Sequence, residues 1–542
     1  MNLKKHVSPA KALRHFGRKQ TLKGAIIIGI LAGMMTVIQG AGYTVTYPDA
    51  RSRAQFASSL ESAPSLGVIY GESKNLVSAS GYIVYRVVPF MSLIASIWGL
   101  VVVTKLLRGQ EEDGRWELIA SSNTSVQSAT WNVLLGFAMS FGLALIISTL
   151  ITTAGGILPD IAMSLVTSML VTLAIFLPAA IFVGLGIFTS QLSMSRRRAM
   201  MYGLIPLLGF FALRALGNTI SDVYWLKHVT PFGWSDLISP VINLQPIWFL
   251  PFIIATPMLV VLGIYLVGKR DLGAGILKES SSAKSHYFLL GSAGTLAIRQ
   301  NILLFIGWGL AALTMSALIG AIASIAANSL IDSPAAKNVV SQLGGSFNDL
   351  KVAVIGAGLV FTVMVLLIMI TTCMATIRGV EAKNYLDNLL VQPIRRSSWL
   401  IIQLLITVVA FTLISVLCAL ATWLIANAQH IAFELGNLLL VSIALTGTVI
   451  FTLGFGTLLY GTLPRLTVIG MYVVIGWSFI IDAIGAVVKL NDLIVKSSLF
   501  HYISFSPTKT PDWSTFAELA AIGVVMAAIG IVAFTKRDII AE

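Results

Sequence analysis

The chain has little of what metal enzymes and disulfide-rich proteins are built from. It contains two cysteines and six histidines in 542 residues. Cys373 and Cys418 both lie inside long apolar stretches, so they predict neither a disulfide framework nor a metal site. The histidines are scattered, with no pair at a ligand spacing such as HExxH. We therefore expect no catalytic residue, no metal and no enzymatic activity in this chain.

Charge is also scarce, at 11% of residues against 56% that are apolar. Val87–Thr104 and Ser397–Phe433 contain no Asp, Glu, Lys or Arg. Because a membrane-spanning helix needs about 20 apolar residues, the sequence predicts an all-α polytopic membrane protein with about twelve transmembrane helices. The predicted spans lie near residues 24–46, 85–106, 129–152, 163–190, 199–217, 246–267, 300–326, 352–376, 399–425, 436–461, 467–488 and 515–535.

The net charge of +13 is best explained by membrane topology. Most lysines and arginines fall on one side of the predicted spans, together with both termini, and basic residues near span ends stay in the cytoplasm. We expect both termini to be cytoplasmic. Nucleic-acid binding would need a basic soluble face, which this chain lacks.

The chain carries an internal repeat. The charged segments that begin at Arg108 and Arg378 are 270 residues apart, half of the chain length. Two tripeptides recur at nearly the same distance: Gly184-Leu185-Gly186 with Gly454-Phe455-Gly456, and Lys269-Arg270-Asp271 with Lys536-Arg537-Asp538. Six spans per half return the chain to its starting side, so we expect two parallel six-helix repeats related by a pseudo-twofold axis along the membrane normal. The predicted domains are 1–270 and 298–542, joined by a cytoplasmic linker over 271–297.

The N-terminal segment Ala10–Leu22 mixes apolar and basic residues, as an amphipathic helix at the membrane surface does. A solvated basic tail is the alternative. At the end of the sixth span, Gly263–Arg270 fits the spacing of a phosphate-binding loop up to its lysine but lacks the hydroxyl residue that binds magnesium. If ATP powers this protein, another chain hydrolyses it.

The two repeated charged segments each lie between the second and third span of their half. In the first, Glu111, Glu112 and Arg115 predict a charged helical face. In the second, Tyr385 and Leu386 begin an apolar stripe that Pro393 ends. Each is predicted to be a short cytoplasmic hairpin with a helix. A helix that merely packs under the membrane is the alternative.

At these residues the chain resembles the permeases of type-2 ABC exporters, most closely the tetronasin and multidrug efflux type with two fused six-span halves. That family has an arginine, one or two glutamates, Gly-Arg-x-Glu-Leu, and then a proline between apolar residues. The matching residues are Arg108, Glu111, Glu112, Gly114, Arg115, Glu117 and Leu118 in the first half, and Arg378, Glu381, Asp387, Leu389, Leu390, Pro393 and Arg395 in the second. The second half has Asn384 and Tyr385 in place of Gly-Arg, and the first has Asn123 where proline is expected.

The resemblance implies a transmembrane permease subunit in a bacterial plasma membrane, which effluxes amphipathic drugs, antibiotics or lipid-like molecules by alternating access. Its coupling helices would lie at about 108–124 and 378–394 and insert into grooves on two ABC ATPase subunits, a homodimer. The chain would bind no cofactor itself, and ATP and Mg would sit on those partners. The remaining partners would be the lipid bilayer and the substrate, with no nucleic acid.

Two other functions remain open on the sequence. A proton-coupled secondary transporter with twelve spans has the same kind of repeat, although Glu111-Glu112-Asp113 does not fit the loop of that family. A membrane scaffold that transports nothing is the other.

Two charges in or near the spans are candidates for a gate. Arg214 and Asp482 fall at nearly equivalent positions of the repeat, and a charge at membrane depth is costly unless it is paired or hydrated. We expect them either to meet on the pseudo-twofold axis or to reach outer water separately.

Overall fold

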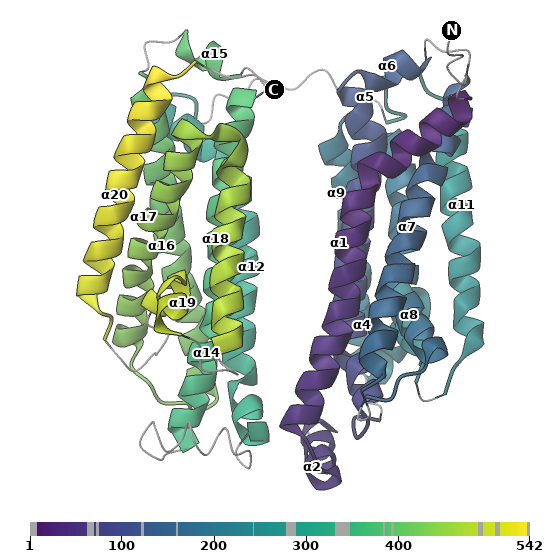
Figure 1. Cartoon of the computed structure of the whole chain (residues 1–542), viewed down its shortest axis with the longest axis horizontal. Coiled ribbons are helices and arrows are strands. Elements are labelled where there is room, and N and C mark those ends of the chain that lie inside the picture. The colour runs from purple at the N-terminus through teal and green to yellow at the C-terminus, as the bar shows by residue number, and fades with distance from the viewer. Residues whose placement is uncertain are drawn as a thin grey trace. The chain divides into compact units, whose positions relative to one another are not determined.

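The computed structural model describes residues 8–61, 70–71, 75–120, 124–158, 161–219, 221–241, 243–277, 289–330, 347–382, 385–391, 395–485, 491–503 and 510–538. Within these ranges the regular structure is entirely helical. The chain divides into two compact units, Met1–Ala283 and Lys284–Glu542, and each is considered by itself below (Figure 1).

Twelve helices of the described chain are long and apolar enough to cross a membrane, six in each unit, and all twelve predicted spans are confirmed. In the first unit they are α1 (Pro9–Thr46), α4 (Ala79–Thr104), α7 (Val126–Gly156), α8 (Leu165–Leu192), α9 (Arg196–Thr219) and α11 (Leu250–Val267). In the second they are α12 (Ala293–Leu330), α14 (Phe347–Ala382), α16 (Arg396–Ala428), α17 (Leu435–Thr462), α18 (Thr467–Gly485) and α20 (Trp513–Lys536).

The connecting segments contain shorter helices. In the first unit these are α2 (Ala50–Glu61), the π-helical turn η2 (Lys105–Gly109), α5 (Gln110–Glu112), α6 (Arg115–Ala120), η3 (Ser221–Val229), α10 (Pro231–Ile238) and η4 (Pro246–Phe249). In the second they are α15 (Tyr385–Leu390), η5 (Pro464–Leu466), α19 (Asp492–Lys496) and η6 (Leu499–Tyr502).

The spans pack in the same pairs in both units. The first span contacts the third, as α1 with α7 and α12 with α16. The fourth contacts the sixth, as α8 with α11 and α17 with α20, and the second contacts the fourth and fifth in each unit. This shared packing agrees with the sequence repeat, while the pseudo-twofold relation between the units stays a prediction.

Helix α1 joins the N-terminal segment to the first span. It runs as one helix from Pro9 to Thr46 and bends near its beginning (Figure 1), so the segment is helical rather than a solvated tail, and its place at the membrane surface stays a prediction. This segment packs on α7, where Arg14 Nε donates to Asn132 Oδ1 at 2.9 Å. The glycines Gly17 and Gly136 lie so close to the opposite backbone that any side chain there would overlap it. Small residues permit this approach.

Helices α17 and α20 meet along a seam of glycines. Gly454 and Gly461 on α17 lie against the backbone of Gly523 and Gly530 on α20, and a Cβ on any of the four would collide with a main-chain atom of the other helix. Without a hydrophobic driving force between helices in lipid, such backbone proximity is a main source of helix association. It holds the last span, and the residues that follow it, on the body of the second unit.

Candidate functional site: two buried clasps beneath the hairpin helices

The first hairpin begins inside the extension of a span. Helix α4 passes into the π turn η2 and then α5, and the helix stops where Gly114 takes a left-handed φ of +72°. Helix α6 starts again at Arg115. Figure 1 shows α5 and α6 at the end of the first unit where α1 begins, and α15 at the end of the second unit where α20 finishes. We call these the hairpin ends.

Beneath the first hairpin, Glu111 forms ion pairs with two arginines. Arg270, just after α11, donates from Nη1 and Nη2 to Oε1 and Oε2 at 2.6 and 2.7 Å. Arg108, one turn earlier on the same helix, donates to Oε2 at 2.9 Å. Arg108 is 1% exposed and Glu111 7% exposed, so the group is buried. Two guanidiniums on one carboxylate leave a net positive charge, which main-chain carbonyl oxygens stabilise by accepting hydrogen bonds.

These carbonyls come from the turn that follows Arg270. Arg108 donates to Gly273 O at 2.8 Å and Ala274 O at 3.1 Å, and Gly273 N donates back to Glu111 Oε1 at 2.6 Å. Gly273 has a φ of +83°, which favours glycine. Arg270 Nε also donates to Gln191 Oε1 on α8 at 2.8 Å. The end of the second span is thereby fastened to the fourth and sixth.

Glu112 makes a separate link to the fifth span. Its Oε1 accepts from the backbone N–H of Arg196, the first residue of α9, at 2.6 Å. A carboxylate at a helix N-terminus accepts a hydrogen bond from a backbone N–H that has no partner within the helix, and its negative charge interacts favourably with the helix dipole. Arg115 donates to Gln110 Oε1 at 2.8 Å. The first hairpin is therefore joined to the fifth and sixth spans by side chains of its own, and to the fourth through Arg270.

The second unit has an equivalent cluster. We call each buried glutamate with its two arginines a clasp: Glu111 with Arg108 and Arg270, and Glu381 with Arg378 and Arg537. Arg537, just after α20, donates from Nη1 and Nη2 to Oε1 and Oε2 of Glu381 at 2.6 and 2.9 Å. Arg378, one turn before Glu381, lies 3.5 Å from Oε2. Glu381 has no exposed surface. Arg537 also donates to Tyr460 O on α17 at 3.3 Å, so the second span is again joined to the fourth and sixth.

This arrangement corrects the predicted coupling helices. Residues 108–112 and 378–382 belong to the extended second spans, and the separate hairpin helices are the shorter α6 and α15. Glu111 does not lie on an exposed charged face with Glu112 and Arg115, because two arginines bury it. Pro393 and Asn384 lie outside the described residues, as does Asn123.

What the hairpins expose is a mixture of apolar and acidic side chains. On α6, Leu118 is 76% exposed beside exposed Glu117. At α15, Tyr385 is 58% and Val391 84% exposed, and Asp387 is also exposed. A partner protein that binds the hairpins would cover these exposed apolar side chains.

Arg214 has a carboxylate partner that the sequence analysis missed. Its Nε and Nη2 donate to Asp236 on α10 at 2.7 and 3.1 Å, and Nη2 also donates to Tyr70 O at 3.2 Å. Arg214 has no exposed surface, so it does not reach outer water. The side chain of Asp482, its predicted partner, lies outside the described residues. The only sequence signal was an acidic residue 22 positions later, at the same end of the fifth span.

Arg270 and Arg537 were also missed as site residues, although both were recognised as parts of a repeated tripeptide. In the described part of the chain no three His, Cys, Asp or Glu side chains lie close enough together to hold a metal ion.

Comparisons with known proteins agree with this architecture. Residues 290–535 match the family model described as Multidrug efflux system permease Rv1217c, C-terminal domain. Over 534 residues the chain is 24% identical to the Multidrug efflux system permease protein Rv1217c of Mycobacterium tuberculosis (strain ATCC 25618 / H37Rv), covering 97% of this chain and 94% of that protein. The chain is similar to a multidrug efflux permease over nearly its whole length. It is a multi-pass membrane protein with twelve candidate spans in its described part.

Proposed function

We propose that this chain is the membrane-spanning subunit of an ATP-driven exporter of the ABC type, which moves amphipathic drugs, antibiotics or lipid-like molecules out of a bacterial cell. Two ATPase subunits on separate chains dock on α6 and α15, and they hold the ATP and Mg. Both termini and both hairpin ends face the cytoplasm. The chain itself performs no hydrolysis.

The observation that carries this proposal is the duplicated clasp. In each unit a buried glutamate at the end of the second span holds the arginine that follows the sixth span, directly beneath a short helix with exposed apolar side chains. A bidentate Arg–carboxylate pair is rigid as well as strong. Such a support suits a helix that must transmit force rather than merely cover the membrane surface.

The clasp also determines which spans move when the hairpin moves. If ATP draws two ATPase subunits together, α6 and α15 move with them, and the clasps pass that displacement to the sixth spans and, through Gln191 and Tyr460 O, to the fourth. A ligand can shift a conformational equilibrium only by its different contacts in two states. In this mechanism the docked helices supply that difference.

Docking is tested by placing a charge on the exposed apolar positions. We expect Leu118→Asp combined with Val391→Asp to abolish co-elution of an ATPase from the solubilised native membrane and to stop ATP-driven dye export in vesicles. Neither residue contributes to a clasp, so the permease folds normally. Leu493→Asp is the matched control, because Leu493 is 79% exposed on α19 and that helix precedes α20 at the opposite end of the unit.

Supplying the vesicles with either ATP or a proton gradient distinguishes the exporter from a secondary transporter and from a scaffold. Export driven by ATP and not by a proton gradient supports the proposal. Export driven by a proton gradient with no co-eluting ATPase would instead identify a secondary transporter, and no transport under either condition would favour a scaffold.

A further inference from the structure

The second unit contains a cavity of about 350 Å³ at the end opposite its hairpin. It lies between α17, η6 and the first turns of α20. Because α20 has 24 residues and a helix rises 1.5 Å per residue, Asp512 at its beginning is about 36 Å from the clasp at its end. This volume is at the lower end of the range of about 300–1,000 Å³ for small-molecule pockets.

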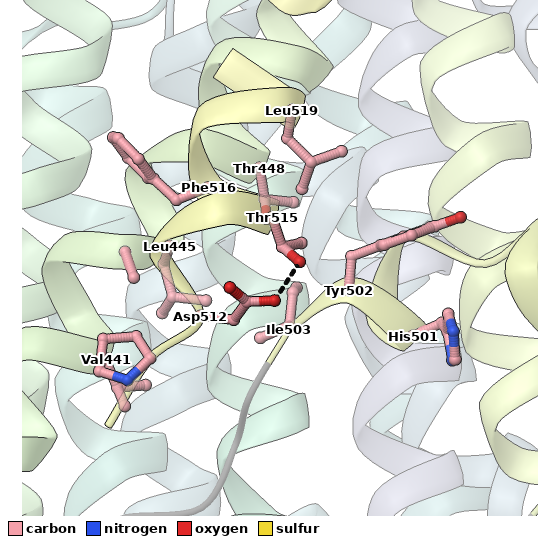
Figure 2. A pocket seen from close by; sticks show the side chains of 12 residues that line it. Val441, Leu445, Thr448, His501, Tyr502, Ile503, Asp512, Thr515, Phe516 and Leu519 are labelled. Atoms are coloured by element: carbon pink, nitrogen blue, oxygen red, sulfur yellow. Dashed lines mark hydrogen bonds between the residues drawn. The ribbon is translucent and has the colours of Figure 1, made fainter. Parts of the chain in front are cut away.

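The walls of the cavity combine apolar and polar side chains, and the one strong charge among its described lining residues is negative. Figure 2 shows the Asp512 carboxylate among side chains from all three elements. The apolar part of the lining is Val441, Ala444, Leu445, Ile503, Pro511, Phe516 and Leu519. The remainder is Thr448, His501, Tyr502, Asp512 and Thr515. Among the lining residues that the structure describes there is no lysine or arginine to neutralise Asp512.

The Asp512 carboxylate is held in place by neutral donors. Oδ1 accepts from Ser514 N at 3.0 Å and Ser514 Oγ at 2.7 Å, and Oδ2 accepts from Thr515 Oγ1 at 2.7 Å. These hydrogen bonds, from Ser514 first and Thr515 next, lower the pKa of Asp512 to about 2. They orient the group and keep it ionised, and they leave its charge in place. Asp512 is exposed, so a ligand that enters the cavity can reach its carboxylate.

We propose that this cavity is a binding site for an organic cation with an apolar body, such as a protonated or quaternary amine that carries aromatic or alkyl groups. The ammonium lies against Asp512, and the apolar body lies between Leu445, Phe516 and Leu519. The rings of Phe516 and Tyr502 add faces that attract a cation.

The chemistry of the walls selects against other ligands. An anion would meet the Asp512 charge with no lysine or arginine in the described lining to offset it. A polar neutral molecule could form hydrogen bonds with the threonine, tyrosine and histidine side chains, but it would lack the charge-assisted contact that Asp512 offers a cation. A charge-assisted contact at one end and apolar contact over the rest is the combination that an amphipathic cation satisfies.

The first unit lacks this charge at the equivalent place. The Lys-Arg-Asp tripeptides align the sixth spans with an offset of 267 residues, which places Gln245 opposite Asp512. Gln245 precedes η4 and makes no side-chain capping bond to that helix. The proposed site therefore belongs to the second unit alone, and it concerns binding by the permease without ATP, beyond the proposed transport cycle.

The test is equilibrium binding of ethidium, an aromatic organic cation, to the purified full chain in nanodiscs of zwitterionic lipid. Fluorescence polarisation reports binding, with empty nanodiscs subtracted. We expect Asp512→Asn to weaken binding at least about tenfold, a loss of about 1.4 kcal/mol. Asparagine still caps α20, so folding is retained. Phe516→Ala should weaken binding severalfold, and benzyltriethylammonium should compete where neutral benzyl alcohol does not.

Asp492→Asn is the matched control, because Asp492 is an exposed acidic residue in the first turn of α19, in the segment between α18 and α20. It should bind ethidium like the unmodified protein. Binding by Asp512→Asn within twofold of the unmodified protein, or an equal loss in Asp492→Asn, would overturn the site. Since no ATPase is present, either result leaves the proposed exporter function to its own test.

Discussion

Arg270 and Glu111 meet edge to edge, with Nη1 2.6 Å from Oε1 and Nη2 2.7 Å from Oε2. The pair joins residues 159 positions apart and ties the end of the sixth span to the end of the second. Arg537 and Glu381 repeat the contact in the other unit. A short sequence motif and a tripeptide at the end of each half are therefore the two partners of one structural device.

We first predict that Glu381→Gln destabilises the protein strongly. Glu381 has no exposed surface, and its removal as an anion leaves Arg537 and Arg378 without their carboxylate. Breaking one partner of a buried pair costs about 3–5 kcal/mol. The midpoint of thermal unfolding in detergent, followed by size-exclusion fluorescence, should fall by several degrees.

Glu117→Gln is the control for this measurement, because Glu117 is exposed on α6 and surface charges contribute about 0–1 kcal/mol. Equal midpoints for Glu381→Gln and Glu117→Gln would show that the clasp contributes nothing to stability.

The second prediction concerns transmission and rests on the proposed function. Arg270→Gln with Arg537→Gln keeps a hydrogen-bonding side chain at both clasps but removes the bidentate charge pairs. We expect ATP hydrolysis by the docked ATPases to continue while the number of substrate molecules exported per ATP falls at least severalfold. Both rates are measured in the same vesicles.

Lys269→Gln with Lys536→Gln is the matched control, since each lysine precedes a clasp arginine in the sequence. If this pair lowers the ratio as much as the arginine pair does, the clasps are not the transmitting element.

The third prediction concerns the glycine seam between α17 and α20. A Cβ on Gly454 would collide with the backbone of Gly523, which has no flexible end that can yield. Gly454→Ala should therefore destabilise the second unit by about 1–3 kcal/mol through overpacking. Gly436→Ala in the same helix is the control, because a Cβ added there would meet no atom within 4 Å, and alanine raises helix propensity. The two variants should move the unfolding midpoint in opposite directions.

Hydropathy was sufficient to predict all twelve spans, because a helix in lipid must satisfy its backbone internally and present apolar side chains. The ends of the helices were harder to predict. Arg108 and Arg378 were assigned to hairpin helices because they are charged, yet each lies in the extension of a span, since its charge is met by a buried carboxylate. Composition alone does not distinguish a charge facing water from a charge facing its partner.

Both sequence motifs that form the clasps were recognised, but their contact was not. The repeated charged segments, which begin with Arg-Gly-x-Glu in both halves, and the repeated Lys-Arg-Asp were both recognised as repeats. The sequence could not show that the glutamate of the first motif binds the arginine of the second. The paired residues are 159 positions apart in the first unit and 156 in the second, so their contact depends on how the spans pack. Two charged motifs that recur together in both halves are the signal that could have linked them.

The last prediction separates two partners for Arg214. Its guanidinium contacts Asp236 twice, at 2.7 and 3.1 Å, and is fully buried, whereas the repeat alone pairs it with Asp482. Residues in one buried ion pair show interaction energies of about 0.5–3 kcal/mol, while distant residues add. We expect Arg214→Ala and Asp236→Ala to be strongly non-additive in unfolding midpoint, because the first deletion leaves the second charge without its partner. Arg214→Ala and Asp482→Ala should be additive in both stability and efflux. Strong coupling to Asp482 in efflux would restore a gate between the units, and additivity with Asp236 would remove the pair that the structure assigns.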